Sequence, residues 1–160
     1  MLGACNKATS AHDPVGDLES ARRNAETTHR SLAALSPACI VGTAAQAPQG
    51  KWLNAPKAFP EPGKANAFIQ QFDASAATGA IRAGLNRAAL RVLDKVETRD
   101  AQGQWTDAGP VTVHEAPPGC DYVWLQQDLG GQRQVEALRY TFRRSEDPVI
   151  VADAGIFISN

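Results

Sequence analysis

Apolar positions follow a helical period in the first part of the chain. From Asp13 to Ser36 they recur in steps of three and four, which places them on one face of an α-helix. These apolar or small residues are Leu18, Ala21, Ala25, Thr28, Leu32 and Leu35. Asp13-Pro14 supplies a capping side chain and a first-turn proline, and Ser36-Pro37 ends the segment. The pattern predicts one amphipathic helix over residues 13–36, preceded by a tether over residues 1–12.

After Ala67 the period changes to two, which is typical of strands. Leu138, Tyr140 and Phe142 share one face, and residues 89–98 read as a strand that turns at 99–103. Gln104-Trp105-Thr106 then returns, with Gly103 at the position that needs a positive φ. Further strand candidates are residues 111–113, 122–125, 135–143, 149–151 and 155–158. The spacing predicts a mainly β domain over 67–160, an antiparallel β-sandwich or barrel.

Two stretches interrupt these patterns. Residues 37–66 are rich in Gly, Pro, Ala, Gln and Asn, with prolines at 48, 56, 60 and 62, and are predicted as a linker loop. Trp52 and Phe59 are expected to anchor that loop to the core, and the alternative is that they form a stacking surface for a sugar. The alanine-rich residues 80–90 are equally compatible with a short helix, and Gly130-Gly131 reads as a turn between strands.

The amino terminus carries a short motif of small residues before a cysteine. Leu2-Gly3-Ala4-Cys5 resembles a lipobox, the site where bacterial signal peptidase cuts and the new terminal cysteine is acylated. The charged and apolar regions of a secretory signal are absent, so we expect Met1 to lie inside a longer signal peptide. The alternative is an accidental match in a cytosolic protein.

The number of cysteines favours an exported protein. The chain has three cysteines, and if Cys5 carries a lipid, Cys39 and Cys120 remain as one pair. Both lie in turn-like settings. A disulfide between them would close a loop of about 80 residues, for which the chain-entropy model gives a stabilisation of about 4.5 kcal/mol. Disulfides persist in the periplasm but not in the cytosol. We therefore expect a periplasmic protein anchored by its lipid to the outer or inner membrane, although two unrelated free thiols remain the alternative.

Composition narrows the class of partner. The 160 residues carry a net charge of −1 and 43% hydrophobic side chains, as in an ordinary globular domain. No Lys/Arg cluster suggests a nucleic-acid groove, and no apolar run is long enough to span a membrane.

The carboxy-terminal two-thirds resembles the galactose-binding, or discoidin-like, jelly-roll fold. The resemblance rests on the strand, hairpin and tryptophan of residues 92–105, the strand of 134–142 and the terminal residues 153–158. It implies an antiparallel sandwich with a ligand surface built from loops at one end, and such domains bind sugars, lipids or proteins. Only a pattern of strands supports it, and it implies no specific ligand.

Catalytic signals are sparse. His114, Glu115 and Asp121 are the best candidates for a metal or acid-base site, but adjacent strand residues point to opposite faces. Calcium at scattered aspartates is a weaker alternative, the residues being Asp94, Asp100, Asp107 and Asp121. No nucleophile elbow, phosphate loop or HExxH helix occurs. We predict that the protein is not an enzyme and uses no cofactor.

Three residues are the predicted ligand contacts: Trp52, Trp105 and Arg139. Tryptophan stacks on sugars and is enriched at protein interfaces, although core packing is the other interpretation of Trp105 and of Trp124. Arg139, with Arg143 and Arg144, either meets a carboxylate or forms a solvated basic edge. Two functions remain open: an envelope lipoprotein that binds a glycan or peptidoglycan, and an immunity or inhibitor lipoprotein that blocks a protein partner.

Overall fold

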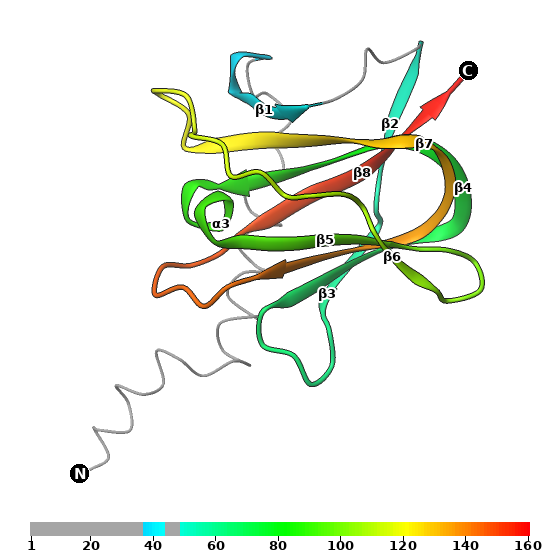
Figure 1. Ribbon diagram of the computed structural model, residues 1–160, viewed down its shortest axis with the longest axis horizontal. Helices are drawn as coiled ribbons and strands as arrows, with labels where there is room; N and C mark the ends of the chain where they lie inside the picture. Colours follow the sequence, from blue (N-terminus) through cyan, green and yellow to red (C-terminus); the bar gives the residue numbers. More distant parts are fainter. Residues whose placement is uncertain (1–36, 44–48) are drawn as a thin grey trace.

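The computed structural model describes residues 37–43 and 49–160, so Cys5, the tether and the predicted helix of 13–36 lie outside the described residues. The described elements are η1 (Pro37–Cys39), β1 (Ile40–Thr43), β2 (Gly50–Asn54), β3 (Lys57–Pro60), β4 (Ala67–Asn86), α3 (Arg87–Val92), β5 (Leu93–Arg99), β6 (Trp105–Asp107), β7 (Tyr122–Phe142) and β8 (Val151–Ser159). Within these residues, no helix is long and apolar enough to cross a membrane. The predicted mainly antiparallel β-sandwich is confirmed (Figure 1).

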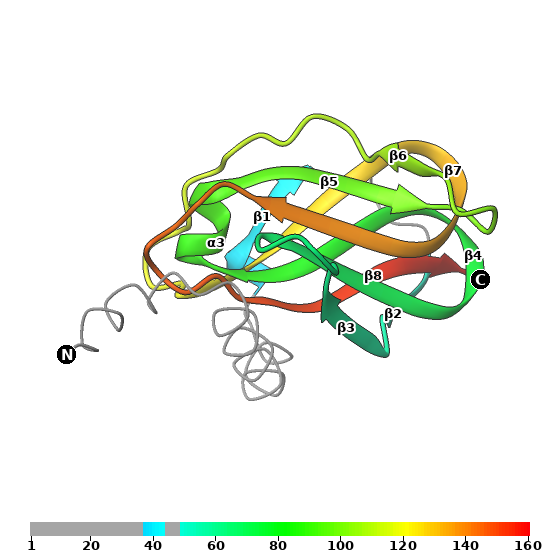
Figure 2. The ribbon, with the colours of Figure 1, turned by 90° about the horizontal axis from the view of Figure 1, so that it is seen from below.

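Two long strands, β4 and β7, run through both layers of the sandwich. Residues 67–71 of β4 pair with 137–141 of β7, whereas residues 80–86 of β4 pair with 122–128. The first pair, with β3, β5 and β6, forms what we term layer A, and the second pair, with β1, β2 and β8, forms layer B. Figure 2 shows the two layers, and in Figure 1 β4 and β7 curve together at the right-hand end.

The bend between the layers has a local cause. Gly130 lies inside β7 with φ +79°, a left-handed value that favours glycine, and its N–H donates to Asp128 Oδ1 at 2.9 Å. Opposite it, the register between β4 and β7 shifts between Gln71 and Ala76 and again between Thr78 and Ala80, as at β-bulges. The glycine pair therefore bends one strand instead of separating two.

The core lies between the layers. Leu138, Tyr140 and Phe142 share its layer A side, as their period predicted, and face apolar residues of layer B. Those residues include Ile81, Leu85, Val123 and Ile156, all fully buried. Burial raises the pKa of the Tyr140 hydroxyl above its ordinary value.

The predicted linker over residues 37–66 is wrong, because this stretch holds β1, β2 and β3. Trp52 lies opposite Phe157 in the β2–β8 pair, and Phe59 lies opposite Ile69 in the β3–β4 pair. Proline is tolerated in edge strands and at strand ends, and Pro60 is the last residue of β3. Pro60 therefore ends an edge strand, and the sandwich begins at Ile40 and not at Ala67.

The boundary between β4 and β5 also differs from the prediction. Residues 80–86 continue β4, and the predicted strand over 89–98 begins only at Leu93, after α3. Asn86 caps this short helix, since its Oδ1 accepts from Ala89 N–H at 3.0 Å. Residues 111–113 form no strand. The β5–β6 hairpin is confirmed, with Gly103 at φ +84°.

The disulfide between Cys39 and Cys120 is confirmed. It joins residues 81 positions apart in the sequence, with their Cα atoms 5.8 Å apart. It ties the residue before β1 to the loop before β7, where the two strands pair in parallel with Ile40 opposite Trp124. The bond therefore secures the edge of layer B.

Candidate ligand-binding face

Trp105 and Arg139, which sequence analysis identified separately, come together on the outer side of layer A. The pairing of β5 with its neighbours places Glu97 opposite Arg139 and Arg99 opposite Trp105. Paired residues project to the same side, and the alternate residue Val96 points into the core. We term this outward surface face A, defined by Glu97, Arg99, Trp105 and Arg139. The Arg139 guanidinium carbon lies 4.1 Å from the centroid of the Trp105 ring, a cation–π geometry.

Two carboxylates hold the Arg139 guanidinium in place. Its Nε donates to Glu97 Oε1 at 2.8 Å, and its Nη1 donates to Glu61 Oε2 at 2.9 Å. The hydrogen bond to Glu97 raises the pKa of Arg139, and the same bond lowers the pKa of Glu97. The side chains of Glu61, Glu97 and Arg139 are largely buried. The two carboxylates therefore fix the guanidinium plane on which the indole of Trp105 lies.

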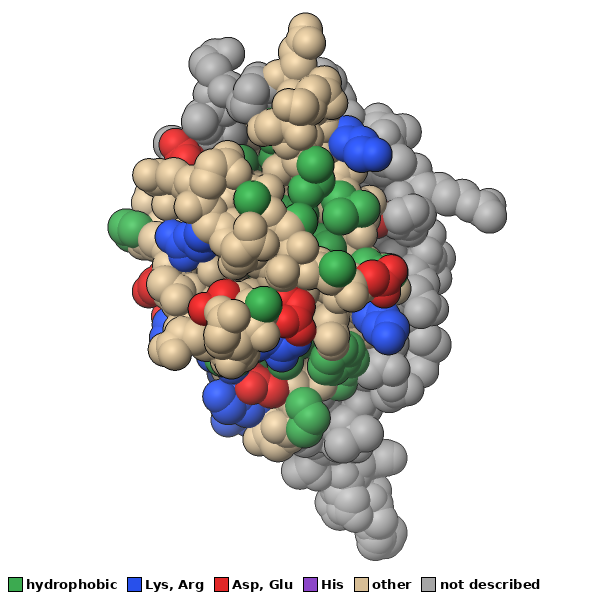
Figure 3. Space-filling view, turned by 90° about the vertical axis from the view of Figure 1, so that its right-hand side faces the viewer, with side chains coloured by type: hydrophobic (Ala, Val, Ile, Leu, Met, Phe, Trp, Pro, Cys, Tyr) green, Lys and Arg blue, Asp and Glu red, His purple; other side chains and the backbone are tan. Residues whose placement is uncertain are grey.

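Further charges surround this centre and are themselves paired. Arg99 contacts Glu136 at 3.4 Å and lies 5.3 Å from the Trp105 centroid. Lys95 approaches Glu97 at 3.4 Å. Figure 3 views the right-hand end of the molecule in Figure 1, where acidic and basic side chains are also interspersed. Face A is thus a balanced polar surface around one partly exposed indole.

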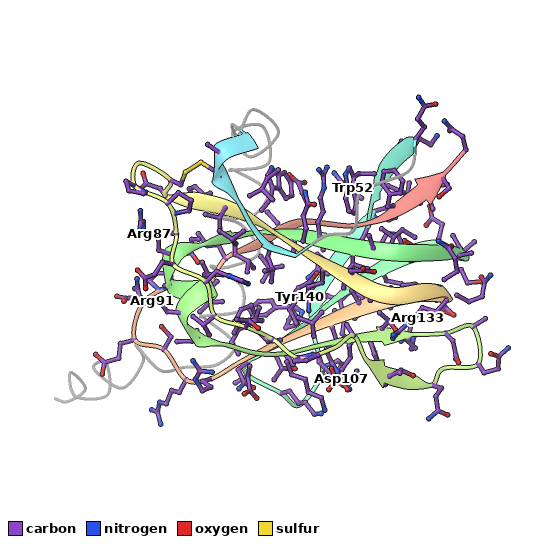
Figure 4. The ribbon with its side chains drawn as sticks, turned by 45° about the horizontal axis from the view of Figure 1, so that its top comes forward. Trp52, Arg87, Arg91, Asp107, Arg133 and Tyr140 are labelled. Carbon is purple, nitrogen blue, oxygen red and sulfur yellow. A yellow bond between two sulfur atoms is a disulfide. The ribbon has the colours of Figure 1, made fainter. Side chains whose placement is uncertain are left out.

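Trp52 lies on the opposite side of the sandwich. We term the outward surface of layer B face B, defined by Trp52, Arg82, Trp124 and Phe157. The Arg82 guanidinium carbon lies 4.6 Å from the Trp52 centroid and 4.3 Å from the Trp124 centroid. The Trp52 and Phe157 rings meet edge to face at 5.2 Å. Figure 4 shows Trp52 at the upper side of the molecule and Asp107, at the end of β6, at the lower side.

Face B is more buried than its position outside the core suggests. Trp124 is 7% exposed and Ala152 is 4% exposed, and together with Tyr122 they form an apolar cluster separate from the main core. Desolvation lowers the pKa of Arg82, partly offset by the charge of Asp153. The Nε of Arg82 is buried and has no hydrogen-bond partner.

The interpretation of Trp105 and Trp124 as core residues is therefore wrong for Trp105, which lies on an edge strand of face A. For Trp124 it is right only as regards burial, because the ring points away from the main core.

The other candidate chemical groups play structural parts or stay apart. In the described part of the chain, His, Cys, Asp and Glu side chains form no group of three that could hold a metal, so His114, Glu115 and Asp121 do not assemble as one. Asp100 Oδ1 accepts from Gln102 and Gln104 N–H groups and so closes the β5–β6 turn.

Arg139 meets carboxylates, as one sequence interpretation expected, but Arg143 does not. Arg143 instead donates to two backbone carbonyls, those of Leu93 at 3.3 Å and Arg91 at 2.6 Å. It therefore holds the chain after β7 against the start of β5 and is not part of face A.

Sequence reasoning missed Glu61, Glu97, Arg82 and Arg99. Glu97 and Arg139 are 42 positions apart, and Glu61 and Arg139 are 78 apart. Only the strand register brings them together. Glu97 lies in a predicted strand, so its charge there was a usable signal, whereas Glu61 lay in the predicted linker.

Comparison with known proteins adds two similar structures. No protein-family model matches the chain, and no curated protein matches its sequence. One similar solved structure is "CpGH89CBM32-6 produced by Clostridium perfringens", with 11% identity over 67% of this chain and 79% of that chain and a TM-score of 0.43. Another is CBM32-1 from a family 31 glycoside hydrolase of the same organism, with 9% identity over 66% and 79% and a TM-score of 0.46. Neither assigns this chain to a family, so its function is argued from its own two faces.

Proposed function

We propose that this chain is a non-catalytic binding module that recognises a glycan, of the cell wall or of a cell surface, on face A. One observation carries the proposal. Trp105 presents a partly exposed indole on an edge strand, stacked on an arginine whose position two carboxylates fix.

The chemistry of face A suits a sugar ring. A pyranose has an apolar C–H face and a rim of hydroxyls, so it needs a flat apolar platform with donors and acceptors beside it. Trp105 supplies the platform, and Arg99 and Glu136 lie at its side as donor and acceptor. Because salt bridges already orient these groups, binding costs little side-chain ordering.

An envelope location is part of the proposal. The lipobox-like Leu2–Cys5 supports a lipid anchor at Cys5, which lies outside the described residues. The Cys39–Cys120 disulfide supports an oxidising compartment such as the periplasm. Labelling with radioactive palmitate in a bacterial host, from a gene with a complete signal peptide, should mark the wild type and not Cys5→Ala. Label on Cys5→Ala would contradict the anchor.

The glycan proposal is tested by pelleting the protein with purified peptidoglycan sacculi and by binding to immobilised neutral and acidic oligosaccharides. We expect saturable binding to at least one of these, weakened tenfold or more by Trp105→Ala, since truncating an aromatic anchor costs about 1.4 kcal/mol or more. Thr106→Ala is the matched control, because Thr106 is an exposed neighbour on the same strand. Equal binding by Trp105→Ala and the wild type would refute face A as the site.

A protein partner is the second candidate, as for an immunity or inhibitor lipoprotein. The observation that favours it is the composition of face A, since tryptophan and arginine are the residues enriched at interface hot spots. Failure to bind every glycan, together with capture of one periplasmic protein that Trp105→Ala does not capture, would support this alternative over the first.

A further inference from the structure

We propose that face A selects glycans without charged groups, and that Glu136 sets this selectivity by keeping the guanidinium of Arg99 paired. The inference rests on the proposed function and deepens it, because it names the class of glycan that face A takes. Sugars that carry a carboxylate, sulfate or phosphate group are bound at least tenfold more weakly than neutral sugars of the same linkage.

The first argument is that cations on face A already have carboxylate partners. Arg139 donates to Glu97 at 2.8 Å and to Glu61 at 2.9 Å, and Lys95 lies 3.4 Å from Glu97. An anionic ligand that approached either cation would lie next to a carboxylate that already neutralises it, and like charges repel. These cations therefore orient the surface without attracting an anion to it.

The second argument concerns Arg99, which is the arginine beside the indole that a ligand reaches most easily. The side chains of Arg99 and Glu136 are 22% and 28% exposed, against 12% for Arg139. Arg99 lies opposite Trp105 in the strand pairing, with its guanidinium carbon 5.3 Å from the indole centroid. A sugar stacked on Trp105 therefore meets Arg99 together with Glu136, which contacts it at 3.4 Å.

A further carboxylate lies on the same side of β6. Asp107 follows Trp105 by two positions, so it projects to the same side, and it is exposed and lies opposite Glu97. The guanidinium of Arg133 is used within the fold, since it donates to Thr98 Oγ1 and to the carbonyl oxygen of Asp107, each at 3.2 Å. The carboxylate of Asp107 thus adds to the repulsion of an anionic ligand.

A neutral sugar meets none of this repulsion. A hydroxyl group both donates and accepts, so it can accept from Arg99 and donate to Glu136 while the two side chains stay paired. A carboxylate only accepts, and it would compete with Glu136 for the same guanidinium. The Arg99–Glu136 pair therefore distinguishes hydroxyl groups from anions beside the Trp105 platform.

The first test uses calorimetry on the full chain and needs no variant. The ligands are the neutral oligosaccharide that binds best, its counterpart oxidised at C6 to the uronate, and the methyl ester of that uronate. At neutral pH we expect a Kd at least tenfold higher for the uronate and within threefold of the neutral sugar for the ester. The Kd of the neutral sugar should change less than twofold between low and physiological salt.

The second test removes the charge that keeps Arg99 paired. In Glu136→Gln, the ratio of the uronate Kd to the neutral-sugar Kd should fall at least fivefold. Glu146→Gln makes the same change of charge at an exposed glutamate after β7 and should leave the ratio unchanged. The ratio separates discrimination by charge from a general loss of affinity, which would raise both Kd values together.

The outcomes distinguish this inference from the proposed function. A uronate bound as tightly as the neutral sugar, or a Glu136→Gln ratio equal to that of Glu146→Gln, would overturn the inference and leave glycan binding by face A standing. Binding to no glycan of either kind would overturn both.

Discussion

Faces A and B both set tryptophan against arginine, yet they surround the arginine differently. On face A, Glu97 and Glu61 bind the Arg139 guanidinium, and Trp105 covers it from an edge strand. On face B, Arg82 lies between two indoles, and its Nε has no hydrogen-bond partner. The pKa of Arg139 is raised and that of Arg82 is lowered.

The difference shows that the Trp–Arg pair has no fixed function. Desolvating a charged group is costly unless carboxylates or ring faces compensate for the lost water. Face A compensates with carboxylates and leaves its indole partly exposed to solvent, which suits a ligand site. Face B compensates with indoles and is largely buried, which suits internal packing.

The largest expected effect on stability comes from removing the disulfide, which holds the edge of layer B and not that of layer A. Removing the disulfide with Cys39→Ala and Cys120→Ala should lower the free energy of unfolding by about 4 kcal/mol, since it frees a long loop in the unfolded chain. Urea denaturation measures this value. Amide exchange should quicken in β1 and the start of β7 but not in the β5–β6 hairpin. A loss under about 1 kcal/mol would contradict the stapling role.

The two indoles should differ in their contribution to stability. Trp124→Ala should cost about 3–5 kcal/mol, because it leaves a cavity under a buried cluster, whereas Trp105→Ala should cost about 1 kcal/mol. Chemical denaturation of both variants gives the comparison. Equal costs, or a larger cost for Trp105→Ala, would mean that the faces are not distinguished by burial.

The two arginines should differ as well. Arg139→Met leaves the buried carboxylate of Glu97 without its main partner and should cost about 3 kcal/mol, part of which Glu97→Leu should restore in the double variant. Arg82→Met keeps an apolar stem between two indoles and should cost about 1 kcal/mol. A double-mutant cycle with no coupling between Glu97 and Arg139 would contradict the role of the ion pair.

The smallest effect concerns pH. The folded-state pKa of Glu97 is depressed, so its contribution to stability is complete above its ordinary pKa of 4.5 and is lost as the pH falls through the folded value. Glu97→Gln should flatten the decline of stability below pH 4.5, and a matching change at exposed Glu146 should not. If stability falls with pH in parallel for the wild type and Glu97→Gln, face A does not contribute to the loss of stability in acid.

Local patterns predicted only part of this structure. The inward face of Leu138, Tyr140 and Phe142 follows from their period, and the β5–β6 hairpin follows from its turn residues. The disulfide followed from counting cysteines. These features depend on neighbouring residues or on a count, so the sequence alone was sufficient for them.

What sequence reasoning missed depends on distant partners. The edge strands β2 and β3 exist because β8 and β4 pair with them, against the local signal of the prolines. Trp52, Trp105 and Arg139 were each predicted to contact a ligand, but β2 lies in layer B and β6 in layer A, so only Trp105 and Arg139 meet. The bend in β4 and β7 separates the two layers. Sequence patterns alone therefore do not show that β2 and β6 lie on different faces.

The most direct test of the account compares the two faces in one binding measurement. Calorimetric titration with the best glycan from the immobilised panel would give the Kd of the full-length wild type, Trp105→Ala and Trp52→Phe. The account predicts a Kd raised tenfold or more for Trp105→Ala and unchanged for Trp52→Phe. Weakened binding by Trp52→Phe with normal binding by Trp105→Ala would contradict it, because the ligand would then lie on face B.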